Sequence, residues 1–150
     1  VWTGDEILGG FQSVSNLLYS EKTGGFAFSF LSNDIASVYE NGKIYSGFEA
    51  VDFLEYTPNG NFVFGFRQNG DWYLSLDGRI FGGYSQIHKP IWNQNHSQYA
   101  YTYQQNGLWY ARYQDKDYGG FESISIRFIY DQLVIAGVKD GYCYLGNAEK

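Results

Sequence analysis

Two histidines, His88 and His96, flank Trp92 and are the only imidazoles in this chain of 150 residues. A histidine pair could begin a metal site, but zinc needs three or four ligands, and no further ligands stand at a suitable spacing. The segment Asp115-Lys116-Asp117 resembles only a fragment of a calcium loop and is interpreted as a charged hairpin tip. The sequence therefore predicts neither a metal site nor a cofactor.

The nucleophiles lack the partners that covalent catalysis requires. Serine is plentiful, but none lies in a nucleophile-elbow motif, and no Ser–His–acid set can be assembled. The single cysteine, Cys143, is expected to be a small buried hydrophobe in a strand, and it leaves the cell compartment open. We expect a protein that is not an enzyme. Hydrolase or lyase activity stays as an alternative that the shortage of histidines and paired acids weakens.

Composition narrows the class of protein further. The net charge is −6, and the ten Lys and Arg residues are scattered, which argues against nucleic acid as a partner. No apolar run is long enough for a membrane span, so membrane insertion is not expected. The chain has 15 Tyr, 12 Phe, 4 Trp and 19 Gly but only 2 Pro, a composition that indicates an all-β protein with many tight turns.

The chain contains four repeats of similar length. In each repeat an aromatic residue, here called the anchor, follows two small residues. The anchors are Phe11, Phe48, Tyr84 and Phe121, at spacings of 37, 36 and 37 residues. Three residues later stand the β-branched Val14, Val51, Ile87 and Ile124. Eight residues after the anchor stand Tyr19, Tyr56, Trp92 and, in the fourth repeat, Ile129 followed by Tyr130.

Each repeat is expected to form four strands, A to D. Strand A is predicted at 17–20, 55–57, 90–93 and 128–130; strand B at 25–30, 61–67, 98–103 and 133–138. Strand C is predicted at 35–40, 71–76, 108–113 and 142–146; strand D at 43–48, 79–84 and 116–121, with an orphan copy at 5–11. Dipeptides suited to two-residue hairpins separate these strands: Asn41-Gly42, Asn69-Gly70, Asp77-Gly78, Asn106-Gly107 and Asp140-Gly141. No segment has a helical period.

Strand B predicts how the sheets pack. Alternation places large rings on one face, such as Phe62, Phe64 and Phe66, and small residues on the other, such as Val63 and Gly65. We expect sheets stacked face to face, with the rings of one sheet filling the shallow side of the next. Most of the aromatic residues would then be core.

This pattern predicts an all-β β-propeller with four-stranded antiparallel blades. The segment 56–64 resembles the strand–Ser-Pro-Asp-Gly–strand signature of bacterial TolB-type, WD-related propeller repeats, and 69–78 and 106–115 resemble the hairpin that follows it. The resemblance implies an interaction scaffold and carries no catalytic residues. We expect one domain, 1–150, with blade units at about 11–47, 48–83, 84–120 and 121–150, and with strand 5–11 completing the last blade. A single four-bladed ring, half of an eight-bladed homodimer formed by strand exchange, and a fragment of a longer propeller all satisfy the pattern.

Binding residues are sought where the repeats disagree, because packing positions must be alike. The connection from strand D to strand A is such a place, and it nominates Asp52, Phe53, His88, Lys89 and Arg127 as contacts for a protein or peptide. The alternative is a carbohydrate-binding, lectin-like propeller. Its candidate platforms are Trp72 and Trp109, at equivalent strand C positions, although Ala36 and Cys143 replace them in the other repeats.

Overall fold

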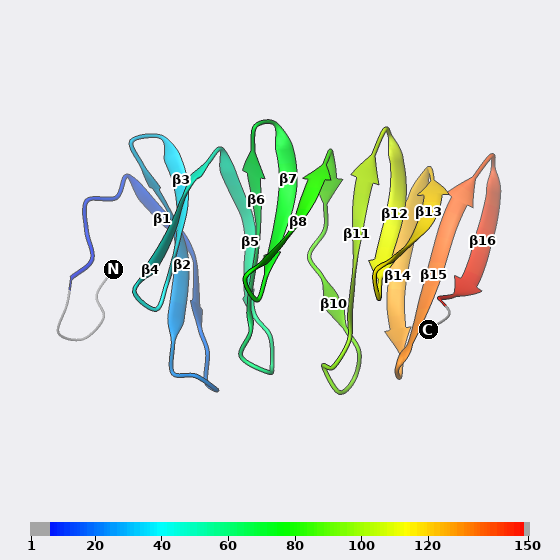
Figure 1. Cartoon of the computed structure of the whole chain (residues 1–150), viewed down its shortest axis with the longest axis horizontal. Helices are drawn as coiled ribbons and strands as arrows, with labels where there is room; N and C mark the ends of the chain where they lie inside the picture. Colours follow the sequence, from blue (N-terminus) through cyan, green and yellow to red (C-terminus); the bar gives the residue numbers. More distant parts are fainter. Residues whose placement is uncertain (1–6, 149–150) are drawn as a thin grey trace. The chain divides into compact units, whose positions relative to one another are not determined.

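The computed structural model describes residues 7–148, and their regular secondary structure is entirely β-strand, arranged in four antiparallel sheets (Figure 1). The first sheet contains β1 (Ser13–Tyr19), β2 (Phe26–Ser32), β3 (Ile35–Glu40) and β4 (Lys43–Phe48). The second contains β5 (Ala50–Tyr56), β6 (Phe62–Gln68), β7 (Asp71–Leu76) and β8 (Arg79–Tyr84). The third contains β9 (Gln86–Ile87), β10 (Ile91–Trp92), β11 (Tyr99–Gln105), β12 (Leu108–Tyr113) and β13 (Lys116–Phe121). The fourth contains β14 (Ser123–Ile129), β15 (Gln132–Lys139) and β16 (Tyr142–Asn147).

In each sheet the strands follow one another in chain order, as expected for four blade units, except that β9 pairs with β11 in the third sheet. All five predicted hairpin dipeptides have positive φ at both residues, the conformation that two-residue hairpin turns require. Two further turns, Asn33-Asp34 and Gln114-Asp115, adopt the same conformation without glycine. Among the described residues no helix is long and apolar enough to span a membrane.

The chain forms two compact units, Val1–Phe81 and Gly82–Lys150, here called the N-terminal and C-terminal units. The first sheet and most of the second belong to the N-terminal unit, and the third and fourth sheets belong to the C-terminal unit. Each unit contains its own stack of sheets with its own hydrophobic core.

The anchor marks the same backbone geometry in all four repeats. The glycine before it has positive φ each time: 83° at Gly10, 95° at Gly47, 82° at Gly83 and 82° at Gly120. The residue after it donates its backbone N–H to the second strand of the following sheet. These four bonds are Gln12 to Leu31, Glu49 to Arg67, Ser85 to Gln104 and Glu122 to Val138, at 2.7–2.9 Å. Only glycine adopts this φ without strain, which explains why the second residue of the small pair is glycine in all four repeats.

The anchor ring then lies against the next sheet. In the N-terminal unit the ring of Phe48 packs 4.4 Å from that of Phe66, and Phe11 packs 4.3 Å from Phe30. In the C-terminal unit Tyr84 stacks 4.1 Å from Tyr103. The glycine and the anchor that follows it therefore connect one repeat to the next, through a backbone hydrogen bond and a ring contact.

The predicted face-to-face packing is confirmed within each unit. In the N-terminal unit the rings of Phe62, Phe64 and Phe66 form one core with Ala27 and Val38 on the first sheet. In the C-terminal unit Leu133 and Ile135 pack with Ala100, Ala111 and Tyr113 of the third sheet. Both faces of the second strand are buried in the first three sheets, as the alternation of large and small residues predicted.

The first strands, the orphan strand and Cys143 depart from expectation in different ways. In the first and second sheets the first strand is longer than predicted, because the segment interpreted as a connecting loop continues the strand through an irregularity. In the fourth sheet it is longer without an irregularity, and in the third it is split into the short strands β9 and β10. Of the orphan strand, residues 5 and 6 lie outside the described part; Ile7 forms an isolated bridge and 8–11 are not in a strand. The pairing of the orphan strand with the last sheet stays a prediction. The expectation that Cys143 is buried was wrong: it is exposed on β16.

Candidate functional site

The five residues nominated for binding lie in or beside the first strand of their sheets. Asp52 and Phe53 sit in β5, where the pairing register with β6 shifts between Val51 and Leu54. His88 and Lys89 lie in the gap between β9 and β10. Arg127 lies in β14, which pairs with β15 without a shift. Irregular pairing re-aims side chains and is common next to binding sites, so the first strand remains a reasonable place for contacts.

His88 is held in a fixed orientation although it is exposed. Its backbone N–H donates to the carbonyl of Thr102 at 2.9 Å, and Nδ1 lies 2.9 Å from the Thr102 hydroxyl. The imidazole stacks on Trp109, with ring centroids 4.6 Å apart and planes 20° from parallel. The structure thus joins two residues that the sequence nominated for different functions.

In the second sheet, the part of the first strand that holds Asp52 and Phe53 makes different contacts. The Phe53 ring lies so close to Gly65 that a Cβ atom there would stand 2.6 Å from the ring. Asp52 is exposed beside it. In the first sheet the same place holds a polar cluster, in which Ser15 and Asn16 bond the Ser29 hydroxyl at 3.0 Å each. The first three repeats therefore place different side chains, with different contacts, at this part of the first strand.

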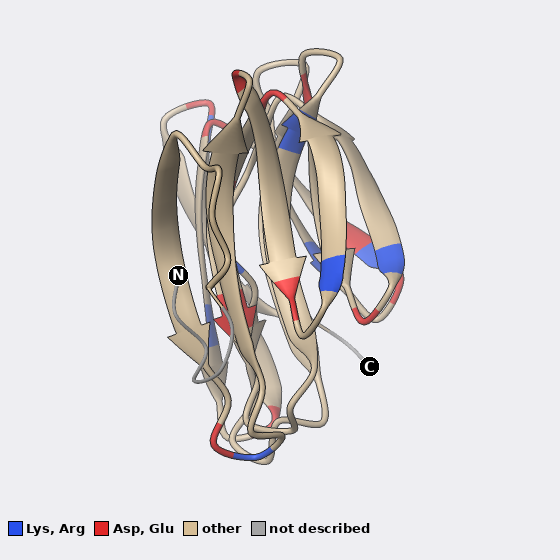
Figure 2. Ribbon diagram, turned by 90° about the vertical axis from the view of Figure 1, so that its left-hand side faces the viewer, with Lys and Arg blue, Asp and Glu red and all other residues tan. Residues whose placement is uncertain are grey.

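Trp72 and Trp109 occupy equivalent register positions, opposite Arg67 and Gln104 respectively. Both are half-buried. One face of Trp109 is covered by His88, which leaves less of that ring for a sugar. Arg127 is exposed on β14, on a different sheet from His88. Many of the charged residues lie at turns and strand ends (Figure 2).

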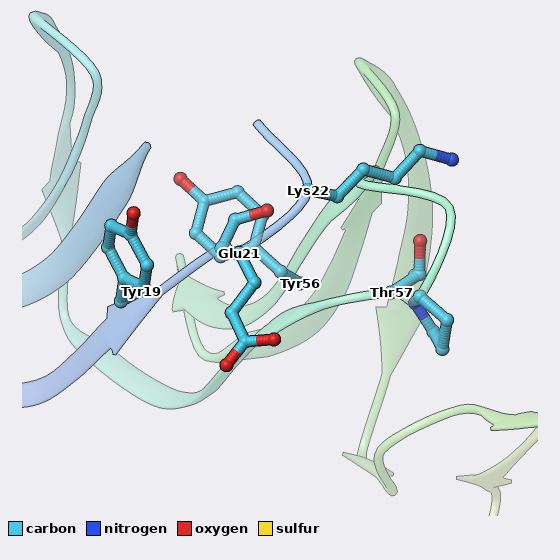
Figure 3. A pocket seen from close by; sticks show the side chains of 7 residues that line it. Tyr19, Glu21, Lys22, Tyr56 and Thr57 are labelled. Atoms are coloured by element: carbon cyan, nitrogen blue, oxygen red, sulfur yellow. The ribbon is translucent and has the colours of Figure 1, made fainter. Parts of the chain in front are cut away.

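A pocket that the sequence did not indicate lies at the other end of the strands. It has a volume of about 490 Å³ and sits in the N-terminal unit, between the loop that follows β1 and the loop that follows β5. Figure 3 shows Tyr19 and Tyr56 as its aromatic walls, with Glu21 in front and Lys22 extending away from them. The Tyr19 side chain is 67 % exposed. We call this cavity the Tyr19–Tyr56 pocket.

Buried hydroxyls hold the two loops of this pocket. Ser20 and Thr57 are buried, and their side-chain oxygens accept the backbone N–H of Thr23 at 3.3 Å and of Asn61 at 3.0 Å. A Cβ placed on Gly60 would stand 3.0 Å from the Thr23 methyl group, so the loops are packed against each other. Hydrogen bonds within each loop and packing between the loops therefore frame the pocket.

The electrostatics of Tyr56 follow from burial and from Glu40. Burial is the main cause that raises the pKa of Tyr56 to about 12, and the nearby Glu40 carboxylate adds to it. The same two causes raise the pKa of Tyr45, whose hydroxyl donates to Glu40 at 3.4 Å. The Tyr56 phenol is thus neutral at physiological pH, and its hydroxyl accepts from Asn41 at 3.4 Å.

The C-terminal unit has a pocket of about 500 Å³, lined by Tyr130, Asp131 and Asn147 among others. Tyr130 has a φ of 55°, which is uncommon for a bulky residue, and it is 79 % exposed. Asp131 accepts a 2.8 Å hydrogen bond from Asn93, which is buried in the loop after β10. An exposed tyrosine beside a carboxylate is a feature that the two pockets share.

Sequence reasoning missed both pockets because each combines loops from different strands. The signal that could have indicated the first pocket is the aromatic position eight residues after the anchor, which is Tyr19 in the first repeat and Tyr56 in the second. Residues 7–148 contain no group of three or more His, Cys, Asp or Glu that could hold a metal ion. No protein-family model matches the chain, and a search of curated proteins found no match.

Proposed function

We propose that this chain is a non-enzymatic binding module that engages a protein or peptide through side chains of the first strand of its sheets. The observation that carries the proposal is the exposed His88 imidazole, stacked on Trp109 and fixed by Thr102. An exposed aromatic surface whose orientation is already fixed loses little conformational freedom on binding, and Trp is a frequent anchor in interfaces.

The chemistry of the surroundings favours an extended segment with acidic and apolar side chains. His88 and Lys89 are adjacent and exposed, and together they offer an acidic side chain a hydrogen-bond donor and a positive charge. Because Nδ1 is engaged by Thr102, a partner would contact the imidazole through Nε2. Asp52 and Phe53 lie in the first strand of the second sheet, and Arg127 lies in the first strand of the fourth. The second, third and fourth sheets would therefore each offer a partner different side chains.

We also propose that the four sheets are repeats of the bacterial TolB-type, WD-related kind. The support is the Thr57-Pro58-Asn59-Gly60 segment, which resembles the signature of those repeats and forms the turn between β5 and β6. Carbohydrate binding at Trp72 and Trp109 is the weaker alternative, since His88 covers one face of Trp109.

The test is selection of a random peptide library on the immobilised full chain, followed by affinity measurements with His88→Asn. We expect enriched peptides whose affinity falls about tenfold, or 1.4 kcal/mol, in the variant. His96→Asn is the matched control, because asparagine tolerates the positive φ of 57° at that position. Peptides that bind the two variants equally well, or no enrichment over an unrelated protein, would refute the proposal.

A further inference from the structure

We propose that the Tyr19–Tyr56 pocket binds a neutral saccharide. This function goes beyond peptide binding at the first strands and does not depend on it. The pocket lies where the first strands end, whereas His88 lies near the start of the first strand of its sheet.

The size and walls of the pocket suit a sugar ring. A volume of about 490 Å³ falls within the usual range of roughly 300–1,000 Å³ for small-molecule sites. A pyranose presents apolar C–H faces and outward hydroxyls, so it needs an aromatic surface with polar groups around it. Tyr19 and Tyr56 provide rings from two neighbouring sheets, and tyrosine combines an apolar body with a polar tip.

The charges that line the pocket favour a neutral ligand. Glu21 supplies an acceptor and Lys22 a donor, so the lining residues carry one charge of each sign. Figure 3 shows the two groups pointing in different directions. Glu21 lies beside the rings, where it can accept from a ligand hydroxyl, and Lys22 extends away from them, where it could meet a hydroxyl farther along an oligosaccharide. A cationic side chain would be attracted by Glu21 and the rings but repelled by Lys22. An anion would be attracted by Lys22 but repelled by Glu21 and by the faces of the rings.

The frame is ready to receive a ligand without rearrangement. The buried Ser20 and Thr57 bond their own loops, and Gly60 packs against Thr23. The Lys22 stem also lies beside Gly60, whereas Tyr19 and Glu21 take no part in these contacts. Binding would therefore order mainly Tyr19 and Glu21, which keeps the entropic cost low.

The experiment is an amide NMR titration of the full chain with neutral oligosaccharides: cellotetraose, maltotetraose, chitotetraose and mannotetraose. We expect at least one to shift the amides of residues 19–22 and 56–58 in a saturable way. Tyr19→Ala should weaken that binding about tenfold, or 1.4 kcal/mol. Glu21→Gln should also weaken it, and it leaves the loop hydrogen bonds intact. Tyr142→Ala is the matched control, because Tyr142 is 69 % exposed on β16 and lies outside the pocket.

Three results would overturn the proposal. The first is no saturable shift at these residues with any of the four sugars. The second is shifts that Tyr19→Ala leaves unchanged, or that centre on Trp72 or Trp109 instead. The third is saturable binding of arginine amide, and of none of the sugars, at the same amides, which would make the pocket a cation site. A thermal melt of each variant distinguishes lost binding from lost folding.

Discussion

At the scale of single residues, Gly137 shows how the repeat tolerates variation. Three sheets place a ring of the second strand against the preceding anchor: Phe30, Phe66 and Tyr103. In the fourth sheet the corresponding residue is Gly137, and the Phe121 ring occupies the space that a side chain would need. At Gly137 the single Phe121 ring fills the space that two facing rings fill in the other repeats, so the sheets can still approach each other.

This arrangement predicts that Gly137→Ala destabilises the protein. A Cβ atom would stand 2.4 Å from Cγ of Phe121, an atom close to the backbone that cannot simply swing away. Overpacking of this kind costs about 1–3 kcal/mol in the free energy of unfolding, measured by denaturant titration. Gly146→Ala is the control, since its added methyl group would have no atom within 4 Å, and its change should stay within about 0.5 kcal/mol. Equal stability of the two variants would contradict the proposed clash with Phe121.

At the scale of elements, the loops between the first and second strands share one construction. Ser20, Thr57 and Asn93 begin these loops in the first three sheets, are buried, and accept a backbone N–H from later in the loop. Asn93 does more, because its amide also donates to Asp131 at 2.8 Å, in the turn between β14 and β15. It thereby ties two sheets of the C-terminal unit together.

Asn93→Ala should therefore lower the free energy of unfolding by about 1–3 kcal/mol. The substitution removes the side-chain acceptor of the Gln98 N–H and the donor that reaches the Asp131 carboxylate, and it truncates a side chain at a buried position. Denaturant titration measures the loss. The neighbouring Gln94→Ala, at an exposed position of the same loop, should change stability by less than about 0.5 kcal/mol. A similar effect of both substitutions would show that the loop, and not the Asn93 bonds, limits stability.

Much of the element structure could be predicted from the sequence, because hairpins are coded locally. The third and fourth strands match their predicted bounds almost residue for residue, since Asn-Gly and Asp-Gly turns fix where each strand ends. The first strands could not be predicted as well. Register shifts in β1 and β5 break the alternation of buried and exposed residues, and Pro90 lies in the gap between β9 and β10.

The candidate sites were harder to predict than the strands. The sequence nominated His88 and Trp109 separately, because the stacking of their rings depends on side-chain directions across the third sheet. The Tyr19–Tyr56 pocket depends on how two loops, more than thirty residues apart in the sequence, pack against each other at Gly60 and Thr23. Such contacts follow from sheet stacking, which the repeat predicts in outline but not atom by atom.

At the scale of the whole molecule, the aromatic residues that build the core also set its response to alkaline pH. Burial raises the pKa of Tyr45, Tyr56, Tyr101, Tyr103 and Tyr113. The pKa of Tyr101 is raised most, because its phenol is buried and hydrogen-bonded to Tyr84 at 3.0 Å. Each of these groups is held in its neutral form by the fold, and ionises more readily when the chain is unfolded.

The fold should accordingly lose stability above pH 10. A phenol whose pKa is higher in the folded state contributes stability that is fully present below its unfolded pKa of 10.0 and is lost as the pH rises through its folded pKa, about 12 for Tyr56. Tyr56→Phe should therefore lose less stability than the unaltered protein between pH 10 and 12, as measured by urea unfolding across that range. Tyr142→Phe, at an exposed position, should behave like the unaltered protein. If Tyr56→Phe shows the same pH slope as Tyr142→Phe, the ionisation of Tyr56 is not coupled to folding.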